Sequence, residues 1–149
     1  MHATLASTHT APPAAVLNPC AATSQPPAIG QPWPGLDGIY AGLSRGEDGQ
    51  PDAHLVLLDA LPAEDLNWAG AVAWAKGLGD GARLPTRFES ALLYANVRDK
   101  LDTNRWHWTG TQYSDANAWF QGFHGGNQDY DDKSYEARAR AVRLIQLAP

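Results

Sequence analysis

The sequence predicts an α+β domain in which two helices pack on a small, mainly antiparallel sheet. Three observations support this prediction. Two apolar runs separated by a turn-rich stretch open the body of the chain, two segments with helical periodicity follow, and the rest combines aromatic and small polar residues in alternating patterns. Strands followed by helices and then by further strands are typical of helices that cover an antiparallel sheet.

The folded body is expected to begin at residue 35, because charge and composition change there. No Asp, Glu, Lys or Arg precedes Asp37, and residues 1–34 hold seven of the eleven prolines. A segment with neither apolar clusters nor charges does not bury enough surface to offset the entropy of ordering. We therefore predict an extended, uncharged Pro/Ala/Ser/Thr-rich arm over 1–34 and a folded domain over 35–149.

The body opens with a predicted β-hairpin. The apolar runs 38–43 and 54–58 flank the stretch 45–52, which is rich in Gly, Asp and Pro. Short apolar runs bounded by such residues are typical of strands. The length of the intervening stretch predicts a long hairpin loop.

A first helix is predicted after Asn67, whose side chain can cap the free amides of the first turn. Gly77 and Gly79 provide a stop. Apolar residues recur between these points at helical spacing, with Trp74 on the adjoining face, namely Trp68, Ala71, Val72 and Ala75.

A second helix is predicted after Thr86, because Thr86 and Glu89 have the spacing of a capping box. In this motif each of the two side chains accepts a hydrogen bond from the backbone amide of the other residue. Pro85 keeps the residue before it extended. The buried face of this helix is expected to comprise Phe88, Ala91, Leu92 and Ala95.

Alternation replaces helical periodicity after Lys100, which predicts strands joined by long loops. Trp106 and Trp108 are expected to share one strand face, opposite His107, and large aromatic residues favour the core. Near the C-terminus, arginines alternate with Ala137, Ala139 and Ala141. Arg138 and Arg140 are expected to pair with Glu136, Asp131 or Asp132 rather than to form an anion site.

Charge and cysteine content exclude several classes of protein. The only cysteine, Cys20, lies in the predicted arm, so neither a disulfide framework nor a thiolate zinc site is expected. The 16 acidic and 11 basic side chains leave a net charge of −5, and the sequence contains no run of basic residues. We therefore expect no nucleic-acid partner. No apolar run is long enough to span a bilayer, so no membrane insertion is expected.

Four pieces of the body, in order, carry a family resemblance. They are GIYAG at 38–42 with RGEDG at 45–49, the helix around Trp68 and Trp74, ARLPTR at 82–87, and WHWTGTQYS at 106–114 leading to RARAVR at 138–143. Together they resemble the DUF1566 family, also called the Lcl C-terminal domain, which occurs in bacterial surface and bacteriophage proteins. The resemblance covers about residues 36–146.

This resemblance implies a C-type-lectin-like fold, which also hosts the variable receptor-binding proteins of some phages and the formylglycine-generating enzymes. The phage-borne members are the most similar to this sequence. We therefore expect a virion protein of the tail-fibre or tail-tip type that contacts a host surface receptor. The alternative is a structural capsid or tail decoration protein that binds no receptor.

No catalytic activity and no cofactor are expected. The formylglycine-generating enzymes use a cysteine-dependent copper site, and the body of this chain has no cysteine. The histidines of the body are scattered without a metal-binding motif. A triad of Ser114, His124 and Asp129 can be drawn on paper, but no strained nucleophile turn surrounds Ser114.

Oxygen ligands at Asn127, Asp129 and Asp131 have a spacing that could bind calcium. The stretch fails the EF-hand pattern, because Asp132 stands where glycine is required and Arg138 where the bidentate glutamate should be. We therefore expect a solvated acidic loop without a metal.

The ligand surface is predicted in the C-terminal loops, since loops on a rigid scaffold carry most recognition and aromatic and amide side chains suit it. Receptor-binding members of the fold also use this part. The predicted ligand-binding residues are Tyr113, Asp115, Asn117, His124, Asn127, Gln128, Asp129 and Tyr130.

The arm is predicted to anchor the protein. Its prolines reduce the entropy lost on binding, and its lack of charge suits burial against another protein. We expect it to dock on another virion protein or on copies of this chain in a small homo-oligomer. The predicted apolar anchors are Val16, Leu17, Ile29 and Trp33.

Overall fold

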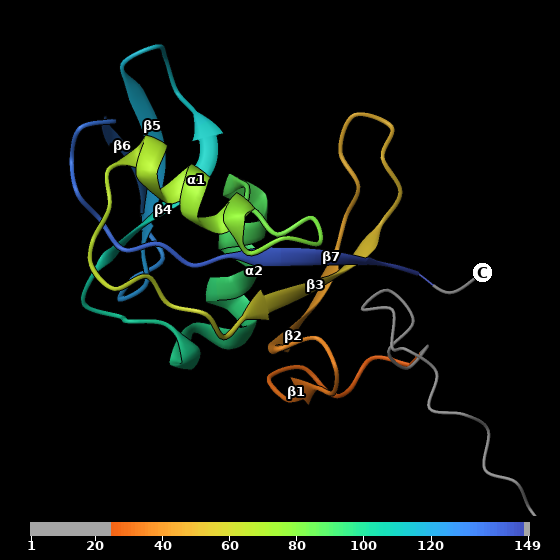
Figure 1. Cartoon of the computed structure of the whole chain (residues 1–149). Helices are drawn as coiled ribbons and strands as arrows, with labels where there is room; N and C mark the ends of the chain where they lie inside the picture. Colours follow the sequence, from red (N-terminus) through yellow and green to blue (C-terminus); the bar gives the residue numbers. More distant parts are fainter. Residues whose placement is uncertain (1–24, 148–149) are drawn as a thin grey trace, which may run out of the picture.

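The computed structural model describes residues 25–147, which form two α-helices and two antiparallel sheets (Figure 1). The α+β class predicted from the sequence is therefore confirmed. In chain order the elements are β1 (Pro32–Trp33), β2 (Gly38–Ser44), β3 (Ala53–Leu58), α1 (Trp68–Gly77), α2 (Arg87–Val97), a short 3-10 helix (Arg98–Lys100), β4 (Trp106–Gln112), β5 (Asn117–Gly122), β6 (Gln128–Asp132) and β7 (Val142–Gln146).

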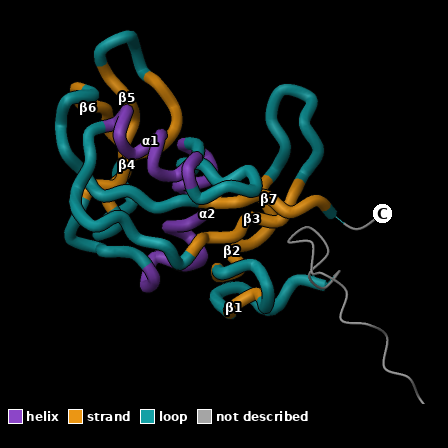
Figure 2. Tube along the Cα trace, viewed as in Figure 1, coloured by secondary structure: helices purple, strands orange, loops and turns teal. Residues whose placement is uncertain are grey.

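The strands divide into two sheets rather than the single sheet that was expected. One has the order β1-β2-β3-β7 and the other the order β4-β5-β6, and all paired strands are antiparallel. Figure 2 shows the two groups of strands well separated, with the helices between them in this view. Helix α2 contacts β2 of the first sheet and both β4 and β5 of the second, so it joins the two.

The predicted hairpin is present as β2 and β3, and it contains a bulge between Tyr40 and Gly42. Gly42 has a φ of 112°, and a Cβ atom at this position would lie 2.8 Å from the Asn96 amide nitrogen. That same nitrogen donates a hydrogen bond of 2.7 Å to the carbonyl of Ala41. Glycine is therefore required at this position both by its backbone angle and by the approach of α2.

The folded body begins before residue 35, which corrects the predicted boundary. Trp33 pairs with Gly38 in the first sheet and is only 2% exposed. Its ring meets those of Tyr40 and His54 edge-on, with centroids 5.4 and 5.5 Å apart. Trp33 is thus a core residue and not an anchor in an extended arm. Composition missed it because the flanking residues are uncharged and proline-rich while the indole itself is buried.

The remaining predicted anchors have different positions. Ile29 lies ahead of β1 and is 50% exposed. Val16 and Leu17 lie outside the described residues.

Both helix starts follow the predicted capping patterns. The Asn67 side-chain oxygen accepts a hydrogen bond of 2.8 Å from the amide of Gly70, and Ala71 and Ala75 of α1 are buried. At α2 the capping box of Thr86 and Glu89 is complete.

The buried face of α2 differs from the predicted one. Phe88 is 69% exposed, and the helix buries its neighbours instead, namely Glu89, Ser90, Leu93 and Val97. The apolar residues of α2 predicted the wrong face, because two polar residues are buried. Glu89 is neutralised by a nearby arginine, and Ser90 is small enough to face the second sheet. These two polar residues therefore occupy buried positions that an apolar pattern assigns to solvent.

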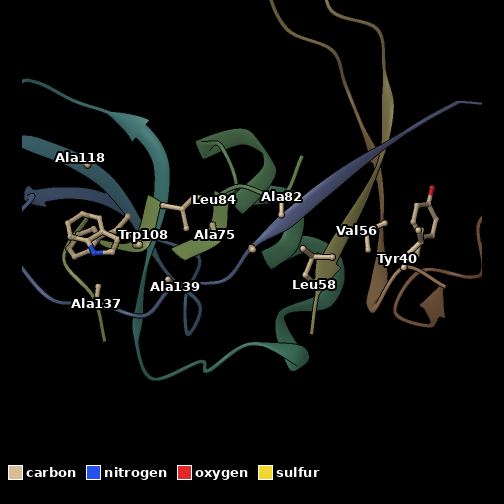
Figure 3. Close-up of a cluster of buried hydrophobic side chains, with 14 of the residues drawn as sticks. Tyr40, Val56, Leu58, Ala75, Ala82, Leu84, Trp108, Ala118, Ala137 and Ala139 are labelled. Atoms are coloured by element: carbon tan, nitrogen blue, oxygen red, sulfur yellow. The ribbon is translucent and has the colours of Figure 1, made fainter. Parts of the chain in front are cut away.

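The main core lies between the sheets and contains the fully buried Trp108, together with Ala75, Leu84 and Ala139 (Figure 3). The Trp108 ring nitrogen donates a hydrogen bond of 2.9 Å to the carbonyl of Leu66. Ala137, Ala139 and Ala141 are buried as their alternation predicted. A second cluster packs between α2 and the first sheet, around Leu55, Leu93 and Val142.

The arginines beside the alanine stripe do not use the predicted acidic partners. Arg138 pairs with Asp65, at 3.4 Å, and more distantly with Asp102. Arg140 donates to the backbone carbonyls of Lys100 and Leu58, at 2.9 and 3.0 Å. These partners lie far away in sequence, so spacing along the chain did not indicate them.

Candidate functional site

The second sheet presents one face that α2 covers only in part. Register places Trp119 opposite Tyr130 and Gln121 opposite Gln128, so these four side chains share that face. Gln121 is buried under α2, where its amide nitrogen donates to the carbonyl of Ser90 at 3.1 Å. The other half of the face, toward the turn between β4 and β5, is left outside the helix.

A group of aromatic side chains occupies this uncovered half. Tyr113 and Tyr130 stack with ring centroids 3.8 Å apart and planes within 4° of parallel. Trp119 meets both rings edge-on, at 5.5 and 5.4 Å. We call Tyr113, Trp119 and Tyr130 the aromatic cluster. Tyr113 is 50% exposed and Tyr130 is 42% exposed, so the stacked pair forms an accessible surface.

Arg87, the first residue of α2, supports the aromatic cluster from within. Its guanidinium lies 3.5 Å from the centroid of the Trp119 ring, a cation–π contact. Its Nε donates a hydrogen bond of 3.0 Å to the Gln128 side chain, whose own amide nitrogen donates to the Arg87 carbonyl and to Gln121 at 2.7 and 2.6 Å. This network holds the indole in place before any ligand arrives.

The Tyr130 hydroxyl of the aromatic cluster is held in its protonated form. The pKa of the Tyr130 phenol lies above its ordinary value, first because it hydrogen-bonds with Tyr113 and then because of charge interaction with that neighbour. A raised pKa keeps this hydroxyl protonated, so Tyr130 offers a ring and a hydroxyl group rather than a charge.

The turn between β4 and β5 is held by its own hydrogen bonds. The carbonyl of Asn117 accepts from the amides of Tyr113 and Ser114, at 3.0 and 3.1 Å. The Lys133 ammonium donates to the carbonyl of Asp115 at 2.8 Å and to the side chain of Gln112 at 2.7 Å. The turn therefore presents Asp115 and Asn117 beside the aromatic cluster on a fixed backbone.

The predicted ligand-binding residues do not converge on one site. Tyr113, Asp115 and Asn117 lie at one end of β5, whereas His124 and Asn127 lie in the turn after its other end, roughly 17 Å away along the strand. Tyr130 joins the first group through its stack on Tyr113.

Gln128 and Asp129 have other positions. Gln128 is partly buried within the network that supports Trp119. Asp129 lies opposite Phe120 and so points to the other face of the sheet, where its carboxylate accepts from the amide of Tyr130. No local pattern in the sequence indicates the contact of Arg87 with Trp119.

His124 and Asn127 border a hollow at the opposite end of the second sheet. This hollow has a volume of about 410 Å³ and is also lined by Trp106. We call it the Trp106 hollow. Trp106 and Trp108 share a strand face as predicted, but only Trp108 is fully buried.

The stretch predicted as an acidic loop is strand β6. The carboxylates of Asp129 and Asp131 each accept a hydrogen bond from the next backbone amide, at 2.8 and 2.7 Å. Among residues 25–147, no three His, Cys, Asp or Glu side chains lie close enough together to hold a metal ion.

The structure does not bring together the residues of the hypothetical catalytic triad, which are Ser114, His124 and Asp129. Ser114 lies in the turn between β4 and β5, and its hydroxyl accepts from the amide of Asn117. His124 lies in the turn at the other end of β5.

Within the part of the chain that the structure describes, no helix has the length and apolar character needed to cross a membrane. In comparisons with known proteins, no family model matches this chain and no curated protein matches it at a significant level.

Proposed function

We propose that this chain is a non-catalytic recognition module that contacts its ligand through the aromatic cluster and the adjoining turn. The observation that carries the proposal is the half-exposed, parallel stack of Tyr113 on Tyr130, supported from below by Trp119 and Arg87. Tyrosine and tryptophan supply large contact areas with few rotatable bonds, and they are enriched in binding hot spots.

The rigidity of this surface favours binding. An exposed aromatic side chain that must be ordered on association costs free energy, and ordering it beforehand removes that cost. Here each ring of the aromatic cluster contacts the other two, and Arg87 and Gln128 fix the indole. The neighbouring Asp115 and Asn117 add polar groups at the rim, where polar contacts confer specificity.

The biological setting rests on the resemblance to the DUF1566 family. We propose a C-type-lectin-like virion protein of a bacteriophage, of the tail-fibre or tail-tip type, whose ligand is a receptor on the host surface. Residues 1–24, which include Val16 and Leu17, would attach the domain to another virion protein or to copies of itself in a small homo-oligomer.

Adsorption of phage particles tests this proposal. Particles that carry Tyr113→Ala together with Tyr130→Ala should adsorb to host cells about tenfold or more weakly, as expected for the loss of a binding hot spot. The matched control is Phe88→Ala, which removes an aromatic side chain that is 69% exposed on α2 and should leave adsorption unchanged.

The melting temperature of each purified variant separates lost binding from lost folding. Both tyrosines are about half exposed, so we expect only a small change in stability. Normal adsorption by a folded double variant would rule out the aromatic cluster as the receptor contact and would favour the structural decoration role.

A further inference from the structure

The indole of Trp106 is held in one orientation by strand β5. It stacks on the Phe120 ring with centroids 4.4 Å apart and planes 18° from parallel. Its six-membered ring also lies against Gly122, where a Cβ atom would be 3.5 Å from the indole. Strand β5 therefore covers part of the indole and holds it in place, so the ring does not need to be ordered by a ligand.

The part of the indole that β5 leaves uncovered borders two hollows. One is the Trp106 hollow, and the other has a volume of about 340 Å³ and extends toward Tyr135 and Glu136. The two hollows share Asn104, Arg105 and Trp106 as lining residues. Each volume is within the range of small-ligand sites. Trp106 therefore lies at the boundary between two adjoining hollows.

Polar side chains without partners surround the indole in the Trp106 hollow. Across residues 25–147, no hydrogen bond joins another described residue to the side chain of Thr103, Asn104, His124 or Asn127. Together, hydroxyl, amide and imidazole groups supply both hydrogen-bond donors and hydrogen-bond acceptors. They are therefore suited to a ligand that carries several hydroxyl groups.

The backbone around these side chains is already in place. The amide of Asn104 donates to the Asp102 carboxylate at 3.1 Å, and the carbonyl of Asn127 accepts from the amide of Gly122 at 2.9 Å. Arg105 is tied to Asp65 by a contact of 2.6 Å. The polar groups are thus carried by turns whose backbone is held by hydrogen bonds of its own.

The charges that line the two hollows balance. Arg105 and Arg138 are offset by Asp65 and Glu136, and both arginines pair with Asp65. A phosphorylated or sulfated ligand requires an excess of positive charge with free donors. The electrostatics therefore favour a neutral ligand.

We propose that the Trp106 hollow binds a neutral pyranose saccharide. The C–H groups on one face of the sugar ring pack on the uncovered part of the indole, and its hydroxyl groups bond to Asn104, His124 and Asn127. The second hollow receives the next sugar of a chain beside Tyr135 and Glu136. This site lies at the other end of the sheet from the aromatic cluster, so it is independent of the receptor contact proposed above.

Ligand-observed NMR and calorimetry on the full chain test the proposal. The probes are glucose, galactose, mannose and N-acetylglucosamine, each with its β-linked or α-linked disaccharide, and glucose 6-phosphate with a sulfated disaccharide for comparison. We expect at least one neutral sugar to bind in a saturable manner, its disaccharide to bind more tightly, and the anionic probes to bind less well.

Two variants locate the binding. Trp106→Ala should weaken it about tenfold or more, which corresponds to at least about 1.4 kcal/mol. Because Trp106→Ala also removes packing on Phe120, Asn127→Ala provides a second test at an exposed side chain that should leave the fold intact and still weaken binding several-fold.

The outcomes separate this proposal from the receptor contact. The Tyr113→Ala, Tyr130→Ala double variant should bind the same sugar with unchanged affinity. The saccharide proposal is overturned if no neutral sugar of the panel binds, if an anionic probe binds in preference, or if Asn127→Ala and Trp106→Ala both leave the affinity unchanged.

Discussion

The Arg83 guanidinium meets the Glu89 carboxylate through two hydrogen bonds, Nη1 to Oε1 at 2.6 Å and Nη2 to Oε2 at 2.9 Å. The same Oε1 atom accepts from the amide of Thr86 at 2.8 Å, which closes the capping box of α2. Glu89 is only 4% exposed, whereas the Arg83 side chain remains 41% exposed. One carboxylate therefore both caps the helix and joins it to the segment before it.

Replacing Glu89 with Gln should lower the free energy of unfolding by about 2–3 kcal/mol, because the change removes the charge that pairs with Arg83 and weakens the cap. Urea denaturation measures the effect. The matched control is Glu64→Gln, at an exposed glutamate, which should stay within about 0.5 kcal/mol of the parent protein. Equal stability of the two variants would show that the ion pair does not stabilise α2.

His107 should make the protein less stable in mild acid. Burial, as the largest cause, lowers the pKa of this histidine from about 6.5 to about 4, and nearby Arg140 and Arg138 act in the same direction. Well above pH 6.5 the imidazole is neutral in both the folded and the unfolded chain, so its full contribution to the free energy of unfolding is present. As the pH falls from 6.5 to 4, only the unfolded chain takes up the proton, so about 3 kcal/mol of stability is lost.

The variant His107→Leu should remove that part of the pH dependence, as measured by urea denaturation at a series of pH values. His124→Gln, at an exposed histidine, is the control and should retain it. A slope that persists in His107→Leu would assign the acid sensitivity to other groups.

Trp33→Ala should destabilise the body by about 3–5 kcal/mol, as for other large residues deleted from a core. The comparison is Ile29→Ala, just outside β1, where the side chain is 50% exposed and the loss should not exceed about 1 kcal/mol. Thermal or chemical unfolding measures both. If Trp33→Ala were as mild as Ile29→Ala, Trp33 would belong to the arm after all.

Gly126→Ala should cost more stability than Gly49→Ala, although both glycines have a φ near 80°. At Gly49 nothing lies within 4 Å of an added Cβ, so only the backbone penalty of about 1–2 kcal/mol applies. At Gly126 the Cβ would also lie 2.6 Å from the Tyr94 ring, which forces the ring or the turn to move. Denaturant unfolding of the two variants gives the difference directly, and equal losses would mean that Tyr94 moves aside freely.

Several elements could be predicted because their determinants lie within a few residues of one another. The caps at Asn67 and Thr86 depend on contacts three residues apart, and the hairpin of β2 and β3 depends on two apolar runs and the turn residues between them. The alternation that buries Ala137 and Ala139 is equally local. Such patterns can be recognised from a few neighbouring residues, because they are consistent with the fold without depending on contacts to distant segments.

The candidate site was predicted in part. Tyr113 and Tyr130 were expected to be accessible, and they are, but their mutual stack depends on how β5 pairs with its neighbours on both sides. Arg87 reaches Gln128 across 41 positions of the sequence, and no periodicity in either segment indicates that contact. His124 and Asn127 were grouped with the tyrosines because they are close in sequence, whereas β5 carries the two turns apart.

The sequence by itself determined where the helices start, where the first hairpin turns and which alternating residues share a strand face, because these follow from capping, turn and alternation rules that act over a few residues. Only the tertiary structure decided which face of α2 is buried, that Trp33 belongs to the core, and that Trp119 lies over Arg87. Each of these depends on the free energy of bringing distant segments together. The pairing of Arg83 with Glu89 is local, since the two residues are six positions apart, but it is also absent from the pattern of apolar residues along the helix. That pattern does not show that an arginine makes the burial of this carboxylate acceptable.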